Sequence, residues 1–150
     1  MSFPVDLYTG VHKGQRYYLS RLSKQAGSLD VNNLEALDHL KSEFSHLREE
    51  FILHAALEEE HIHPLLYERI PEGARDLEED HIRQRENLEA LGNCLEVLSE
   101  KPMDFEPRGE LALEFYRGLN RFIASYLVHV DKEEEVIQPM LWRICTEKEL

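Results

Sequence analysis

Two segments of this sequence place a histidine and a glutamate at a spacing that suits metal binding. The first contains His54 and Glu58, and the second, 75 positions later, contains His129 and Glu133. In an α-helix, residues i and i+4 lie on one face, about 6 Å apart along the axis. Each pair would therefore present one imidazole and one carboxylate to the same cavity.

A second pair of segments also matches. One runs from His12 to Leu19 and the other from His81 to Leu88. Both have a glutamine three residues and an arginine four residues after the histidine. The chain thus contains two copies of one unit, each with a first histidine followed by a His-x-x-x-Glu pair.

These polar residues lie on stripes of apolar residues that should face the interior of a helical protein. A buried ionised glutamate costs several kcal/mol unless it is paired or binds a metal, and no Lys or Arg occupies these stripes. Four imidazoles and two carboxylates exceed what one tetrahedral zinc site needs. They suit two metal ions, each held by two histidines and both bridged by the carboxylates. The predicted ligands are His12, His54, Glu58, His81, His129 and Glu133.

The elements that must position these residues are four amphipathic helices. Apolar residues recur at alternating steps of 3 and 4 over residues 8–26, 37–65, 77–98 and 111–140. Residues 1–7 are a lead-in and residues 101–107 a linker. The pattern predicts a single all-α domain over residues 1–150, an antiparallel up-down-up-down four-helix bundle with an internal two-fold repeat. Two long hairpins swapped between subunits are the alternative.

Other polar residues have less definite predicted roles. Gln15 and Gln84 fall one turn from a ligand histidine and would either orient the ligands or be partly exposed. His61 follows His54 by seven residues and could be a further ligand or a proton relay. Tyr8 could donate a hydrogen bond to a bridging carboxylate. Filler or solvent-exposed positions are expected for His39, His46, His63, Glu59, Glu60, Glu134 and Glu135.

Composition excludes several classes of function. The chain is 42% hydrophobic and 31% charged, and 17 basic against 30 acidic residues give a net charge of −13, which disfavours nucleic acids and anionic membranes. The start has no signal peptide and no segment is long and apolar enough to span a membrane. Cys94 and Cys145 form no spaced motif, which fits a reducing, cytoplasmic location.

A ferritin-like di-iron site is a rival hypothesis. Glu58 with His61 and Glu78 with His81 both read Glu-x-x-His. That scheme also needs a lone glutamate on each of the other two helices. The first helix carries no acidic residue after residue 7, and Val136 stands where the last helix would need a histidine. The ferritin-like interpretation therefore fails on two helices.

The whole pattern resembles the hemerythrin-like family, named for its His-His-Glu cation-binding motif. It is carried by the six predicted ligands and by Pro64 and Pro139, ten residues beyond each paired histidine. The resemblance implies a non-haem di-iron centre, bridged by Glu58, Glu133 and an oxo or hydroxo group. The oxygen-carrying members have a second histidine four residues from the one on their third helix, but Leu77 and Arg85 occupy those positions here.

In those carriers the last helix also places its carboxylate five residues after the histidine. Here Glu133 follows His129 by four residues, and Glu134, which follows it by five, is the alternative ligand. The resemblance is therefore to the four-His, two-Glu relatives that sense iron or repair iron centres, and it speaks against reversible oxygen carriage.

These observations predict a cytoplasmic protein with two iron ions that binds or reduces a small oxidant, namely dioxygen, peroxide or nitric oxide. His12 and His54 would hold one iron, and His81 and His129 the other. The alternatives are a non-catalytic iron or oxygen sensor, an iron-storage module and a structural zinc bundle. Ligand type leaves zinc and manganese open as well. The sequence does not identify a protein partner or a redox donor.

Overall fold

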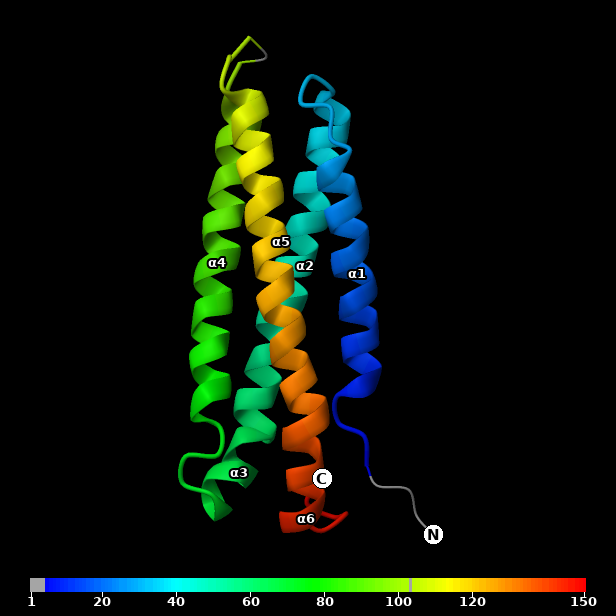
Figure 1. Ribbon diagram of the computed structural model, residues 1–150, viewed down its shortest axis with the longest axis vertical. Coiled ribbons are helices and arrows are strands. Elements are labelled where there is room, and N and C mark those ends of the chain that lie inside the picture. Colours follow the sequence, from blue (N-terminus) through cyan, green and yellow to red (C-terminus); the bar gives the residue numbers. More distant parts are fainter. Residues whose placement is uncertain (1–4, 103) are drawn as a thin grey trace.

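The computed structural model describes residues 5–102 and 104–150, and every regular element in those ranges is helical. Residues 1–4 of the predicted lead-in lie outside the described part. Four long helices lie side by side along the long axis of the molecule (Figure 1). They are α1 (Thr9–Gly27), α2 (Leu34–His61), α4 (Arg75–Glu100) and α5 (Arg108–Lys132), accompanied by the short helices α3 (His63–Arg69), η1 (Glu133–Ile137) and α6 (Gln138–Ile144).

The predicted apolar stripes form the main core of the bundle. Each long helix packs on two others, α1 on α2 and α5, and α4 on α2 and α5. Aromatic side chains meet in the middle, with ring centroids of Phe44 and Phe115 5.7 Å apart and those of Phe51 and Tyr126 4.5 Å apart. Burial of these stripes is the main stabilising contribution to a bundle of this kind.

The end of the bundle away from α3 and α6 is closed by polar contacts to backbone groups. Asn33 caps α2 by accepting a hydrogen bond from the backbone N–H of Ala36. The buried side chain of Arg108 donates hydrogen bonds to the carbonyl oxygens of Val31, Lys101 and Pro102, which joins the α1–α2 connection to the α4–α5 linker.

The regular α-helical geometry is interrupted in two places, shortly after Glu58 in the second long helix and from Glu133 in the last one. The second helix is interrupted at Ile62, directly before α3 begins at His63, and the last helix passes through the π-helical turn η1. A π-helical turn inserts one extra residue, so the side chains beyond it rotate relative to a regular α-helix. Ile137 and Leu141 are therefore buried, whereas Val136, which the stripe predicted to face inward, is 48% exposed.

None of the helices in the described ranges is long and apolar enough to cross a membrane.

Candidate metal centre

All six predicted ligands come together in one place, inside the bundle and toward the end that carries α3 and α6. The elements that supply them are α1 for His12, α2 for His54 and Glu58, α4 for His81, α5 for His129 and η1 for Glu133. They fall into two groups, His12 with His54 and His81 with His129, which share both glutamates. Within each group the candidate ligand atoms lie within 4.8 Å of one another.

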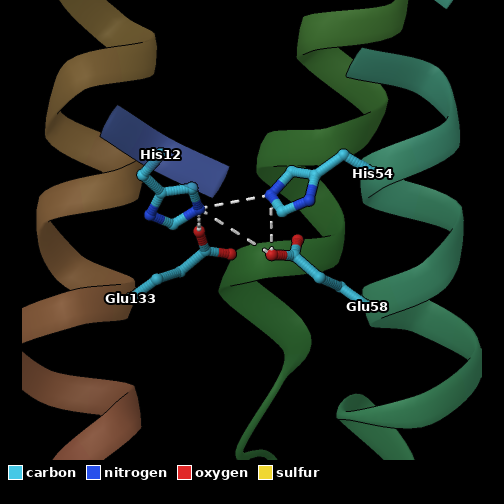
Figure 2. A group of neighbouring side chains, drawn as sticks. All are labelled: His12, His54, Glu58 and Glu133. Carbon is cyan, nitrogen blue, oxygen red and sulfur yellow. Dashed lines mark hydrogen bonds and ion pairs between the residues drawn. The ribbon is translucent and has the colours of Figure 1, made fainter. Parts of the chain in front are cut away.

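Glu58 lies between the two groups, with one carboxylate oxygen directed to each. Its Oε1 is 2.9 Å from Nε2 of His54, and its Oε2 is 3.2 Å from Nε2 of His81. Figure 2 shows the first of these contacts, together with the approach of His12 from α1. The carboxylate therefore has the orientation that a bridge between two cations requires.

Glu133 occupies the equivalent position on the other side. Its Oε2 is 3.3 Å from Nε2 of His12, and its Oε1 is 3.1 Å from Nε2 of His129. Figure 2 shows Glu133 facing the centre from the last helix. Glu134, the alternative ligand suggested by the carriers' spacing, instead contacts Nδ1 of His12, on the edge of the ring away from Glu133.

Carboxylates outside the centre fix the orientation of three of the imidazoles. Nδ1 of His12 is 2.8 Å from Glu134, that of His81 is 2.9 Å from Glu59, and that of His129 is 3.2 Å from Asp80. An ionised carboxylate can only accept hydrogen bonds, so each of these Nδ1 atoms carries the proton and donates. This leaves Nε2 as the ring nitrogen that can bind a metal in the centre, once any proton on it is released.

The outer glutamates are themselves held by arginines. Arg16 donates two hydrogen bonds to Glu134, and Arg85 donates one to Glu59. Partial burial raises the pKa of Glu59, but the hydrogen bond from His81 and the charge of Arg85 outweigh it and hold that pKa below its usual range. The expectation that Glu59 and Glu134 are merely solvated was wrong.

A signal for these outer carboxylates was present in the sequence. Each lies directly after a bridging glutamate, and an arginine follows the first histidine of each unit by four residues, as Arg16 and Arg85. On a helix that spacing puts the arginine on the same face as the histidine, within reach of a shared partner.

The centre concentrates buried negative charge that a cation would offset. Glu58 and Glu133 are 2% and 0% exposed, and none of their four carboxylate oxygens has a hydrogen-bond partner in the described part of the chain. Burial opposes the charged form of Glu133, but the imidazoles of His12 and His129 lower its pKa, so it stays ionised. Converging carboxylates and imidazole lone pairs are the donor set of a transition-metal site, and the residues present therefore fit such ions.

Three other polar residues that the sequence analysis considered differ in burial and in hydrogen bonding. Tyr8 is buried and stacks on the His12 ring, but its hydroxyl has no hydrogen-bond partner in the described ranges, contrary to the expected bond to a carboxylate. Gln15 is buried and accepts a hydrogen bond from the Tyr126 hydroxyl. Gln84 is half-buried.

His61 and His63 lie in different environments. His61 is exposed, with Glu60 beside it, and belongs to neither group of candidate ligands, so the structure does not support the hypothesis of a further ligand. His63, expected to be filler or exposed, is buried against His81, with ring centroids 5.5 Å apart, and bonds Glu78.

Comparison with known proteins agrees with this arrangement. Residues 4–141 match the model of the hemerythrin HHE cation-binding domain. The chain is also similar to F-box/LRR-repeat protein 5 of Xenopus tropicalis, at 30% identity over 149 residues, and to that of Xenopus laevis, at 27% over 150 residues. Each alignment covers 97% of this chain and 21% of the relative, so the chain spans about a fifth of their length. The comparison with solved structures gave no match.

Proposed function

The chain belongs to the hemerythrin HHE cation-binding domain family, and from this premise we propose that it is a non-haem di-iron protein that binds or reacts with a small oxidant. One iron would be held by His12 and His54 and the other by His81 and His129, with Glu58 and Glu133 as bridges. The candidate oxidants are dioxygen, peroxide and nitric oxide.

One observation carries this proposal. Two buried carboxylates each direct their two oxygens to two separate pairs of imidazoles, and no described Lys or Arg contacts those oxygens. A cation on each side would satisfy all of these groups at once. Two cations fit this donor set better than one, because both glutamates belong to both groups.

The protein's own residues prepare the centre for such ions. Glu134, Glu59 and Asp80 hold three imidazoles in the binding tautomer, and the surrounding core limits the access of water. Bound iron would supply one-electron redox chemistry and affinity for small oxidants, whereas the chain sets coordination and access.

We interpret the bundle as an up-down-up-down arrangement with an internal repeat. Two features support this. The sequence colours run along the long axis in alternating directions in Figure 1. The link from ligand histidine to outer glutamate to arginine also occurs twice, as His12–Glu134–Arg16 and as His81–Glu59–Arg85.

A sensor module is the second candidate function. It is favoured by the relation to much longer proteins, of which the matching segment is about a fifth. A domain whose stability depends on bound iron could report iron or oxygen to other parts of a longer chain. The two free cysteines are compatible with a reducing, cytoplasmic setting for either function.

Substitution of one bridge tests the assignment of the site. Glu133→Ala should reduce the iron content per chain and change the absorption spectrum, because both ions lose a ligand. Glu135→Ala is the matched control, since Glu135 belongs to the same acidic run but is exposed. Unchanged iron stoichiometry and spectrum in Glu133→Ala would show that Glu133 is not a ligand.

Turnover separates the two candidate functions. Loss of peroxide catalysed by the iron-loaded protein would support an oxidant-reacting protein. Iron-dependent protection from proteolysis without turnover would support a sensor.

A further inference from the structure

The four imidazoles of the centre are not held equally. His12, His81 and His129 each donate from Nδ1 to a carboxylate, at 2.8, 2.9 and 3.2 Å. No such partner is found for Nδ1 of His54 among the described residues. Fixing the second ring nitrogen orients a ligand and increases its basicity, so His54 is the least constrained ligand of the four.

His54 is also the imidazole most open to solvent. Its side chain is 15% exposed, whereas those of His12, His81 and His129 are 0%, 1% and 3% exposed. The least restrained ligand thus lies at the edge of the site, on the face formed by α1 and α2.

Two cavities reach His54 from this face. One of about 530 Å³ is bounded by Val11 and Leu57 and extends to both His54 and Glu58. The other, of about 510 Å³, runs between α1 and α2 and contains His54 and Val11. Three further cavities in the described ranges contain none of the six ligand residues.

The α1 side of the second cavity is kept open by two glycines. A Cβ atom added at Gly10 or at Gly14 would meet no other atom within 4 Å. Both residues line this cavity, so no side chain from these positions of α1 obstructs the approach to His54.

From these observations we propose that small molecules reach the metal centre through the α1–α2 face, and that the position held by His12 and His54 is the exchangeable one. The inference rests on the proposed function and assigns an access route and an order of lability to its two metal positions. The position held by His81 and His129 is the retained one, because carboxylates fix both of its imidazoles.

The lining indicates which molecules can use this route. The larger cavity is mostly apolar, with Leu7, Leu57 and Leu65 among its walls, and its acidic residues are Glu58 and Glu149. A cavity of this character favours small uncharged molecules, such as dioxygen, nitric oxide or hydrogen peroxide, and disfavours anions.

Release of ferrous iron to a chelator tests this asymmetry. The protein is loaded with Fe²⁺ without oxygen and mixed with an excess of a ferrous chelator, and the absorbance of the chelate is followed. Two phases of one iron each are expected. Val11→Trp, which narrows both cavities, should slow the fast phase. Leu113→Trp is the matched control, because Leu113 is exposed to a similar extent (44% against 43%) but borders neither cavity.

A ligand substitution identifies which position is labile. His54→Ala should abolish the fast phase and leave one iron that is released slowly. Far-UV circular dichroism checks folding, and Leu57→Trp replaces Val11→Trp if that variant does not fold.

The outcomes separate the two proposals. The access route is overturned if the wild-type protein binds two irons and releases them in a single phase. It is also overturned if the tryptophan substitution does not change the release rates. Either result leaves the proposed di-iron function in place. A protein that takes up no iron overturns the proposed function itself.

Discussion

At the scale of single residues, adjacent glutamates have different roles. Glu58 faces the interior, whereas Glu59, about 100° further round the same helix, faces α4 and accepts a hydrogen bond from His81. Glu133 and Glu134 have the same relation to the centre and to His12. In the proposed centre the inner member of each pair would bind metal, and the outer member contacts an imidazole and would orient it.

Glu59→Gln tests the outer position. The amide keeps the shape and an acceptor oxygen but removes the charge that stabilises the His81 tautomer. The affinity for metal should fall by about 10- to 100-fold, as measured by competition with a chelator of known affinity. Glu60→Gln is the control, because the Glu60 side chain is 72% exposed. Equal affinities in the two variants would contradict the orienting role.

Tyr8 is a second residue whose role can be tested. Its hydroxyl is buried without a partner, and burial, together with the nearby charges of Glu133 and Glu58, raises its pKa well above the usual range. Removing an unsatisfied buried hydroxyl should be neutral or stabilising. Tyr8→Phe should therefore change the free energy of unfolding of the metal-free protein by less than about 1 kcal/mol in urea titrations. A loss of more than about 2 kcal/mol would show that the hydroxyl makes a stabilising contact.

Much of the site could be predicted from residue types and spacing. The six candidate ligands were predicted because buried imidazoles and carboxylates recur at a helical period, and the structure brings them together. The roles of Glu59 and Glu134 were missed because a run of three glutamates reads as a solvated face. Only the packing of α4 and α1 shows that one member of each run meets a histidine.

At the scale of elements, the π-helical turn η1 decides which residues of the last helix are inside. A strict 3.6-residue period predicted Val136 to be buried, but the extra residue in the turn buries Ile137 instead. The helical period carries no information on such an insertion, which is why the sequence placed the helix correctly and its last turns incorrectly.

Two alanine substitutions test this register. Ile137→Ala should lower the free energy of unfolding by about 2–4 kcal/mol, because it leaves a cavity in the core around Leu66 and Leu141. Val136→Ala should change it by about 0.5 kcal/mol or less. Urea unfolding of the metal-free proteins measures both. The opposite ranking would mean that the last helix continues in regular α-helical register.

Arg108 has a structural role at the other end of the bundle. Its replacement by methionine would leave the carbonyl oxygens of Val31, Lys101 and Pro102 without these donors. The expected loss of stability is about 2–4 kcal/mol, with metal stoichiometry unchanged because the site lies at the opposite end. Arg117→Met, at an exposed position of the same helix, is the control. Loss of metal in the folded Arg108 variant would contradict the separation of the two ends.

At the scale of the whole molecule, apolar side chains pack along the bundle, and the ligand centre adds buried charge to one end of it. Residues around Phe44 and Phe115 form a continuous core, whereas the ligand end contains two buried carboxylates that repel each other without a cation. Metal binding should therefore stabilise the folded protein and act mainly on that end.

Removal of the metal by a chelator should lower the melting temperature. With free metal at 100 times its dissociation constant, binding contributes about 2.7 kcal/mol, which corresponds to about 5–10 °C for a chain of this size. Hydrogen exchange should increase in the second half of α2 and in η1, and much less around Arg108. A uniform increase along all four long helices would contradict a local effect.

The most direct test of the di-iron assignment is the metal content of the protein purified in air, measured together with its absorption spectrum. The arrangement of four imidazoles around two shared carboxylates predicts two irons per chain and near-ultraviolet absorption typical of a bridged iron pair. One zinc per chain, or a folded bundle with no metal, would contradict it and leave a structural or binding role for this domain.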